Sequence, residues 1–317
     1  MTLGLSPVIF GLEREALTVR EYALFSKTRP IGYILFARNC ITPDQLDALV
    51  ADIKAIHTDY TPLILIDQEG GRVARLKEPH WVTPPAPKTY ADMVENSIDD
   101  ACVAAQQGSH IIGETLAQHG INVNCAPMCD VRFEHSHNII GDRAYGMDAQ
   151  QVITLARAVA NGLKSARILP VIKHIPGHGR ATLDSHEALP VVTASLEELQ
   201  IDFAPFKALR DIPLAMTAHI IYTALDDTQP ATWSKKVISL IREDIGYTHL
   251  IMSDDICMNA LSGSYGDRAR ATLDAGCDII LHCDGCYDDM ADVTEAIKDY
   301  PLIDVTKLNN IYRWLDT

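Results

Sequence analysis

The chain has 317 residues, 47% hydrophobic and 22% charged, a composition that excludes general disorder and allows a large core. Its net charge of −15 argues against a nucleic-acid or anionic-membrane partner, because either would repel so acidic a surface. No stretch approaches the roughly 20 consecutive apolar residues that span a bilayer, and the first twelve residues do not resemble a signal peptide. We therefore expect a soluble, cytoplasmic protein that acts on a small molecule, with eight reduced cysteines.

Short apolar runs alternate with longer amphipathic stretches along the whole chain. The runs are mostly continuous, as is typical of strands buried on both faces, and they span 7–12, 31–36, 62–67, 121–126, 169–175, 213–219, 249–254 and 278–283. Helical patterns lie between them, for example at 43–57, 98–119, 149–166, 195–209 and 235–244. Plausible helix starts and ends are Pro43, Ser195, Ser234, Gly120 and Gly246.

This order predicts an α/β fold, a TIM-type (β/α)8 barrel that forms a single domain over residues 1–317. A doubly wound sheet is the alternative. Such a sheet usually carries a glycine-rich phosphate turn after its first strand, and FGLERE at 10–15 is not such a turn.

Polar residues close several of the predicted strands: Asp67, Lys173 with His174, His219, and Asp254 with Asp255. Burying an unpaired charge is costly, and the active site of such barrels forms at the C-terminal strand ends. We expect these side chains to converge on one mouth. Alternation along a strand predicts that Asp255 faces away from Asp254.

The densest polar segment is 173–186, where the end of a strand runs into a loop with Gly177 and Gly179. The glycines suggest a loop that can move or approach a ligand closely. Asp184 and His186 stand two residues apart and can pair, an arrangement that makes a histidine useful for proton transfer near neutral pH. A solvated surface loop is the alternative for this pair taken alone.

Neither a metal nor a cofactor is expected in the site. Barrel amidohydrolases need a His-x-His at the end of the first strand, and FGLE has no histidine. Cys283 and Cys286 form a Cys-x-x-Cys, but no second pair stands at zinc-site spacing. We therefore interpret these cysteines as reduced thiols without a metal.

Three motifs resemble the signatures of glycoside hydrolase family 3. They are Ile66-Asp67-Gln68-Glu69-Gly70-Gly71-Arg72-Val73, Lys173-His174-Ile175-Pro176-Gly177-His178-Gly179 with Asp184-Ser185-His186, and Ser253-Asp254-Asp255. The segments 32–39 and 125–131 extend the likeness, which covers most of the chain in the right order. Within that family, the chain resembles the bacterial single-domain β-N-acetylhexosaminidases of peptidoglycan recycling. The sequence departs from the family pattern at 255–260 and 141–145.

The resemblance implies roles that spacing alone cannot give. Asp254 would be the nucleophile of a retaining mechanism with a covalent glycosyl-enzyme, and His186, assisted by Asp184, the general acid/base. Asp67, Arg75, Arg143, Lys173 and His174 would hold the sugar. The substrate would be a saccharide or muropeptide that carries terminal β-linked N-acetylglucosamine on an anhydro-muramic acid.

Retaining glycosidases usually employ two carboxyl groups, and a histidine in the second role has a physical rationale. A neutral imidazole does not repel an anionic nucleophile or acceptor. Two alternatives therefore stay open: a phosphorylase of the same family, in which phosphate replaces water, and a barrel that binds sugar without turnover. Glu69 and Arg72 are interpreted as internal partners of the glycine turn.

Overall fold

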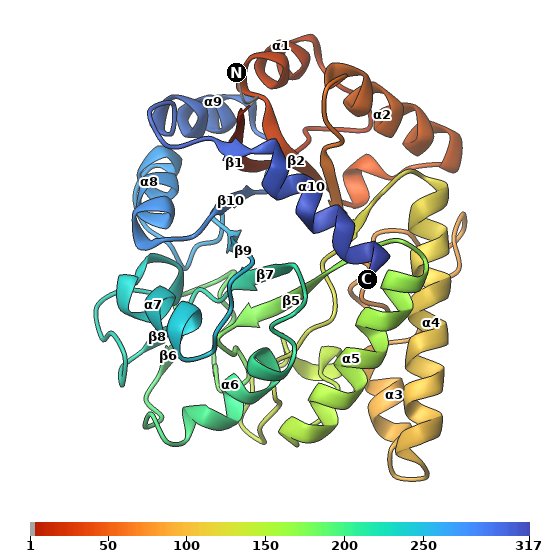
Figure 1. Cartoon of the computed structure of the whole chain (residues 1–317), viewed down its shortest axis with the longest axis vertical. Helices are drawn as coiled ribbons and strands as arrows, with labels where there is room; N and C mark the ends of the chain where they lie inside the picture. Colours follow the sequence, from red (N-terminus) through yellow and green to blue (C-terminus); the bar gives the residue numbers. More distant parts are fainter. Residues whose placement is uncertain (1–3) are drawn as a thin grey trace.

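A computed structural model describes residues 4–317 as a closed parallel barrel surrounded by helices (Figure 1). The barrel strands are β1 (Gly4–Gly11), β2 (Pro30–Leu35), β3 (Leu63–Ile66), β4 (Val123–Asn124), β5 (Leu169–Ile175), β7 (Leu214–Thr217), β9 (Leu250–Asp255) and β10 (Ile279–His282). The barrel closes where β10 pairs in parallel with β1, with Val8 opposite Ile280. The predicted (β/α)8 fold is confirmed.

The helices form the outer layer of the molecule. They are α1 (Val19–Thr28), α2 (Pro43–Ile56), α3 (Pro87–Met93), α4 (Ile98–Gln118), α5 (Ala149–Ser165), α6 (Leu199–Ala208), α7 (Lys235–Glu243), α8 (Tyr265–Ala275), α9 (Tyr287–Ala296) and α10 (Val305–Arg313). Between residues 4 and 317, no helix has both the length and the apolar character needed to cross a membrane.

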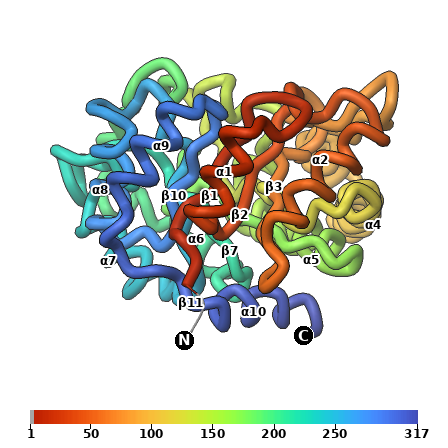
Figure 2. Tube along the Cα trace, turned by 90° about the horizontal axis from the view of Figure 1, so that it is seen from above, coloured from red at the N-terminus to blue at the C-terminus, as the bar shows by residue number. Residues whose placement is uncertain are grey.

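The C-terminal segment covers the end of the barrel at which the strands begin. There β11 (Ile303–Asp304) pairs antiparallel with the start of β1, and α10 lies across the opening (Figures 1 and 2). Leu308 and Ile311 of α10 belong to the same buried cluster as Leu5 and the apolar interior of the barrel. This end is therefore plugged, which leaves the opposite end for a site.

Most predicted helix boundaries agree with the structure, and the one at Ser195 is wrong. Pro43 opens α2, Ser234 caps α7 by accepting a hydrogen bond from Val237 N–H, and Gly120 follows α4 with φ +70°. Helix α6 begins at Leu199 instead. Ser195 exchanges hydrogen bonds with Glu198, so it stabilises the turn that precedes the helix.

The barrel interior shows why the site lies where it does. In β3, β5 and β9, alternate residues face inward and are apolar: Leu63 and Leu65, Leu169 and Val171, and Leu250 and Met252. Two residues further along the same three strands stand Asp67, Lys173 and Asp254. Because side chains alternate along a strand with a period of two, these polar residues face the same way as the apolar residues before them and lie at the mouth of the barrel.

A second, two-stranded parallel sheet lies outside the barrel wall. It pairs β6 (Val191–Val192) with β8 (Ile221–Tyr222). Strand β6 lies in the loop that follows β5, and β8 lies in the loop that follows β7. The pair therefore joins two of the loops at the mouth of the barrel.

Candidate active site

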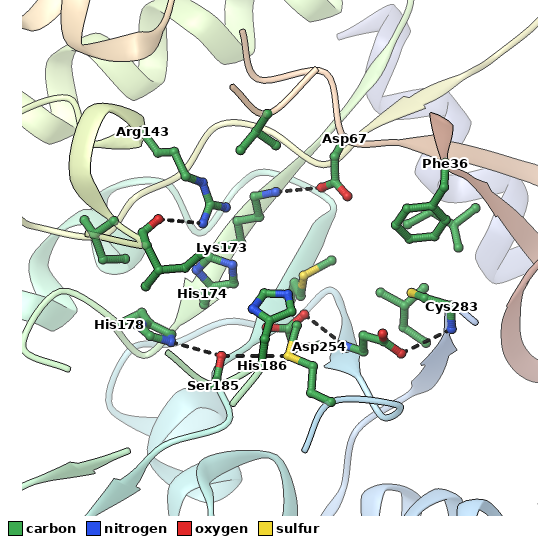
Figure 3. A pocket seen from close by; sticks show the side chains of 18 of the residues that line it. Phe36, Asp67, Arg143, Lys173, His174, His178, Ser185, His186, Asp254 and Cys283 are labelled. Carbon is green, nitrogen blue, oxygen red and sulfur yellow. Dashed lines mark hydrogen bonds and ion pairs between the residues drawn. The ribbon is translucent and has the colours of Figure 1, made fainter. Parts of the chain in front are cut away.

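A cavity of about 310 Å³ opens at the C-terminal ends of the strands. Its wall includes most of the predicted site residues: Asp67, Arg75, Arg143, Lys173, His174, His186 and Asp254. Figure 3 shows many of these side chains around one common space. Asp184 is outside the wall, and its carboxylate binds the Nδ1 of His186. The expectation that the strand ends converge is therefore correct for β3, β5 and β9.

Asp254 lies at the end of β9 with only 6% of its surface exposed. Its Oδ1 accepts a hydrogen bond from the N–H of Asp255 (2.8 Å), and its own N–H donates to Thr217 Oγ1 (3.3 Å). Burial alone would raise the pKa of this carboxyl, but His174 and His219 outweigh burial and hold the pKa below its usual value. Asp254 is therefore an anion at neutral pH.

Asp255 also lines the cavity, so the prediction that it faces away from Asp254 is wrong. The register between β9 and β10 shifts next to it, and such an irregularity breaks strict alternation. Its Oδ1 is already engaged, because it accepts the N–H groups of Cys257 (2.9 Å) and Cys283 (3.1 Å). We infer that Asp255 ties the loops after β9 and β10 together.

The prediction that His219 faces the mouth with the other strand ends is also wrong, because this residue is fully buried and lies outside the cavity wall. Its Nε2 lies 2.9 Å from the Asp255 carbonyl oxygen and its Nδ1 lies 2.8 Å from Thr232 Oγ1. Position 219 is out of phase with the inward residues Leu214 and Met216 of β7. It therefore supports the end of β9 and does not face the mouth.

Five charged residues form a cluster on one side of the cavity, called here the buried ion cluster: Asp67, Glu69, Arg75, Arg143 and Lys173. Glu69, Arg143 and Lys173 are buried, and Asp67 and Arg75 are half-buried. Lys173 Nζ lies 2.8 Å from Asp67 and 2.6 Å from Glu69. Arg143 binds Glu69 through two nitrogens, at 2.8 and 2.7 Å, and Arg75 lies 3.1 Å from Asp67. The cluster contains three cations and two carboxylates, and each carboxylate bridges two of the cations.

Electrostatics keep this cluster ionised. Burial would raise the pKa of Glu69, but Arg143 and Lys173 outweigh it and lower the pKa to about 2. Burial would likewise lower the pKa of Lys173, and its two carboxylate partners reverse that effect. The interpretation of Glu69 as a partner of the glycine turn holds for its backbone, whose N–H donates to the Val73 carbonyl group (2.9 Å), whereas its side chain binds residues from two distant segments.

The glycine turn brings Arg75 back alongside Asp67. Gly70 has φ +106°, and a Cβ there would lie 2.0 Å from the Pro85 carbonyl oxygen, so no other residue fits. Arg72 extends from this turn to Asp142 (2.8 Å) and to two carbonyl groups of the 138–142 loop. Arg72 therefore holds that loop against the cavity, and its partner is not the turn itself.

Asp130 is a buried carboxylate that the residue patterns did not single out. Its Oδ2 lies 2.7 Å from His174 Nδ1, and its Oδ1 accepts the backbone N–H of His178 (2.6 Å). It thereby orients the His174 imidazole and holds the backbone at His178, just beyond the end of β5. Burial, with His174 nearby, lowers the pKa of His178 to about 4, so that ring is neutral.

His186 and Asp184 form a pair on the loop that follows β5. Asp184 Oδ1 lies 2.7 Å from His186 Nδ1 and also accepts the His186 backbone N–H at 2.9 Å. The His186 side chain is 57% exposed, whereas Asp184 is 16% exposed. Because the carboxylate occupies Nδ1, the nitrogen that can exchange a proton with a ligand is Nε2.

The base of this loop packs closely against neighbouring backbone segments, and the suggestion that its glycines let the loop move or approach a ligand stays a prediction. A Cβ on Gly179 would lie 1.7 Å from the Val131 carbonyl oxygen, so the glycine permits close packing of two backbone segments. Tyr222 Oη donates to the Gly177 carbonyl group (2.7 Å). Further along, Ala260 N–H donates to the Ser185 carbonyl group (3.2 Å), which joins the loop to the one after β9.

Known proteins resemble the chain over almost its whole length. A β-hexosaminidase from Nitrosomonas eutropha is 33% identical over 97% of this chain and 89% of that protein. A β-hexosaminidase from Bordetella avium is 36% identical over 87% of this chain and 80% of its own length.

A solved structure, NagZ from Neisseria gonorrhoeae in complex with N-trifluoroacetyl-D-glucosamine, superposes with a TM-score of 0.89 at 31% identity. The alignment covers 99% of this chain and 91% of that one. Residues 19–310 match the N-terminal domain of glycosyl hydrolase family 3. With the catalytic-barrel fold and the full-length similarity in agreement, the chain belongs to glycosyl hydrolase family 3 and is a glycoside hydrolase.

Proposed function

We propose that the protein is a retaining β-N-acetylhexosaminidase in which Asp254 is the nucleophile and His186 the general acid/base. The observation that carries this proposal is the contrast between the two groups that share one cavity. Asp254 is a buried anion held on a strand end, and His186 is an imidazole whose Nδ1 is bound by Asp184. Attack needs a fixed, ionised oxygen, and proton transfer needs an oriented imidazole.

In the first step, an Asp254 oxygen forms a bond to the anomeric carbon while the glycosidic C–O bond breaks. The departing oxygen takes the proton from His186 Nε2. In the second step, His186 removes a proton from water, the water oxygen attacks the anomeric carbon, and the ester bond to Asp254 breaks. Asp184 stabilises the protonated imidazole and holds its orientation throughout.

The sugar is held by the buried ion cluster and His174. Asp67 has each carboxylate oxygen paired with one cation, and each oxygen keeps a further lone pair that can accept a sugar hydroxyl. Lys173, Arg75 and Arg143 supply donors around it, and His174 is oriented by Asp130. Because these residues are paired before the ligand arrives, binding needs little reorganisation.

The substrate class rests on the relatives and on the chemistry of the site. Relatives carry the name β-hexosaminidase, and one neighbour binds an N-acylated glucosamine. We propose that the enzyme releases terminal β-linked N-acetylglucosamine from muropeptide fragments with an anhydro-muramyl unit. The eight cysteines, all of them unpaired within residues 4–317, and the net charge of −15 support a cytoplasmic location and no nucleic-acid or membrane partner.

A substrate panel tests the proposal. The protein should hydrolyse an aryl β-N-acetylglucosaminide far faster than the matching β-glucoside, and NMR should detect the β-anomer of the sugar first. Equal rates on both glycosides would contradict the N-acetyl preference, and an α-anomer would contradict retention. A rate that rises with phosphate, with a sugar phosphate as product, would identify the phosphorylase alternative.

A further inference from the structure

A second cluster of chemically reactive side chains lies behind β10, on the face turned away from the cavity. It consists of Cys257, His282 and Asp284, and one donor atom from each lies within 4.8 Å of the others. Leu281 and Cys283 line the catalytic cavity, whereas these three residues are outside its wall. Strand alternation explains the separation, because His282 faces opposite to its two neighbours.

His282 is the unusual member of this cluster. Its side chain is fully buried, beside the rings of Phe10 and Tyr265 at centroid distances of 5.9 and 5.3 Å. Neither ring nitrogen makes a hydrogen bond to any residue in the described range 4–317. A buried polar group without a partner is destabilising and rare in proteins. We therefore expect this imidazole to bind a ligand.

The nitrogen that faces the rest of the cluster is Nδ1. It lies 3.6 Å from Asp284 Oδ1, which is too long for a hydrogen bond. Two ligand atoms bound to one tetrahedral ion at about 2.0–2.3 Å stand roughly 3.3–3.6 Å apart. The observed separation is that of two ligands of a shared ion, and Cys257 completes the set with a sulfur atom.

We propose that Cys257, His282 and Asp284 bind a zinc ion outside the active site. A thiolate, an imidazole and a carboxylate together suit Zn²⁺ and disfavour Mg²⁺ and Ca²⁺, which prefer oxygen ligands only. Asp284 is 30% exposed, so the ion can enter from solvent and water can occupy a fourth position. This site differs from a catalytic metal, since none of its ligands reaches the cavity.

Zinc at this position would connect the two loops that follow β9 and β10. Cys257 belongs to the first loop and Asp284 to the second, and the Asp255 carboxylate already links the same loops. The first loop also carries Met258 of the cavity wall and the Ala260 N–H that binds the His186 loop. The ion would therefore stabilise the surroundings of the site without taking part in the reaction.

The test is a titration of the chelator-treated, full-length protein with Zn²⁺, and with Co²⁺ as a spectroscopic probe. We expect one zinc per chain, a higher Tm with zinc, and a thiolate-to-cobalt charge-transfer band in the near ultraviolet. Cys257→Ser should abolish that band and weaken zinc binding by roughly 100-fold or more, since even outer partners of metal ligands contribute about 10–100-fold.

Two variants serve as controls. Cys102→Ser changes another half-buried thiol, in α4, and should bind zinc as the wild type does. Asp284→Asn is a second, less buried ligand change and should also weaken binding, which covers the case that Cys257→Ser does not fold. Zinc binding that survives both ligand variants, or that is lost in His186→Ala, would overturn the proposal by assigning the ion to the catalytic cavity.

Discussion

The two sides of the cavity are built in opposite ways. On one side, the buried ion cluster places Asp67, Glu69 and Lys173 near strand ends, and each of these three residues contacts two opposite charges. On the other side, His186 stands on a loop, is 57% exposed and has one partner among residues 4–317, Asp184. The first side is fixed before any ligand binds, whereas the second depends on a single local pair.

Under the proposed mechanism, this difference separates sugar recognition from proton transfer. Groups that hold a sugar gain from rigidity, because less order has to be imposed on binding. An acid/base that serves a departing oxygen and then a water molecule needs access to solvent and a ring held in one orientation. If the two sides have these separate roles, variants on the two sides should fail in different ways.

Asp254→Asn should have the largest effect, because the amide keeps the shape of the carboxylate and loses the anionic oxygen that is proposed to attack. We expect kcat to fall by about 10⁴-fold or more, while substrate still binds through the intact ion cluster. Steady-state kinetics and calorimetric titration of substrate measure the two quantities.

Asp255→Asn is the matched control, one residue away on the same cavity wall. Its amide oxygen can still accept the N–H groups of Cys257 and Cys283, so most activity should remain. A greater loss in Asp255→Asn than in Asp254→Asn would show that the nucleophile is assigned to the wrong residue.

His186→Ala should slow substrates with poor leaving groups by about 10²–10⁴-fold and activated aryl glycosides far less. The alkaline fall of kcat/KM should also flatten, since the acid that loses its proton is gone. The measurement is kcat/KM against pH for a series of leaving groups. An unchanged alkaline limb would show that another residue is the general acid, and His178 would be the first imidazole to test.

Glu69→Gln should mainly affect stability, because it leaves Arg143 and Lys173 buried with one partner fewer. Loss of one partner from a buried ion pair destabilises by about 3–5 kcal/mol. Asp184→Asn, on the exposed loop, should cost less than about 1 kcal/mol. Urea unfolding compares the two variants, and equal losses would contradict the contrast between the two sides.

The stability difference between wild type and Glu69→Gln should shrink in acid. The pKa of Glu69 is lowered from 4.5 to about 2 in the folded protein, so its ionised form contributes stability fully above about pH 4.5. That contribution is lost as the pH falls through 2, and the variant has no such titration. Thermal unfolding between pH 5 and 2 measures the difference, and a constant gap would refute the linkage.

Short-range patterns predicted the barrel because its signals are local. Continuous apolar runs define buried parallel strands. Two positions beyond the last inward-facing apolar residue of a strand stand the polar residues Asp67, Lys173 and Asp254. The same rule failed at Asp255 and His219, where the register shifts or the phase changes. Alternation is therefore a sound guide along a strand and a poor one at its last residue.

Glu69 and Asp130 could not be predicted from local patterns, because their partners are distant. Glu69 binds Arg143 at a separation of 74 residues, and Asp130 binds His174 at a separation of 44. Both lie in long connections whose paths are decided by tertiary packing. The zinc ligands have the same property, since nothing in the sequence links Cys257 to His282.

The most direct test of the central claim is to trap the glycosyl-enzyme with a 5-fluoro N-acetylglucosaminyl fluoride and identify the labelled residue by peptide mass spectrometry. We expect one sugar per chain, attached to Asp254, and no labelling of Asp254→Asn. A sugar on Asp255, or an enzyme that turns over without any trapped ester, would contradict this expectation.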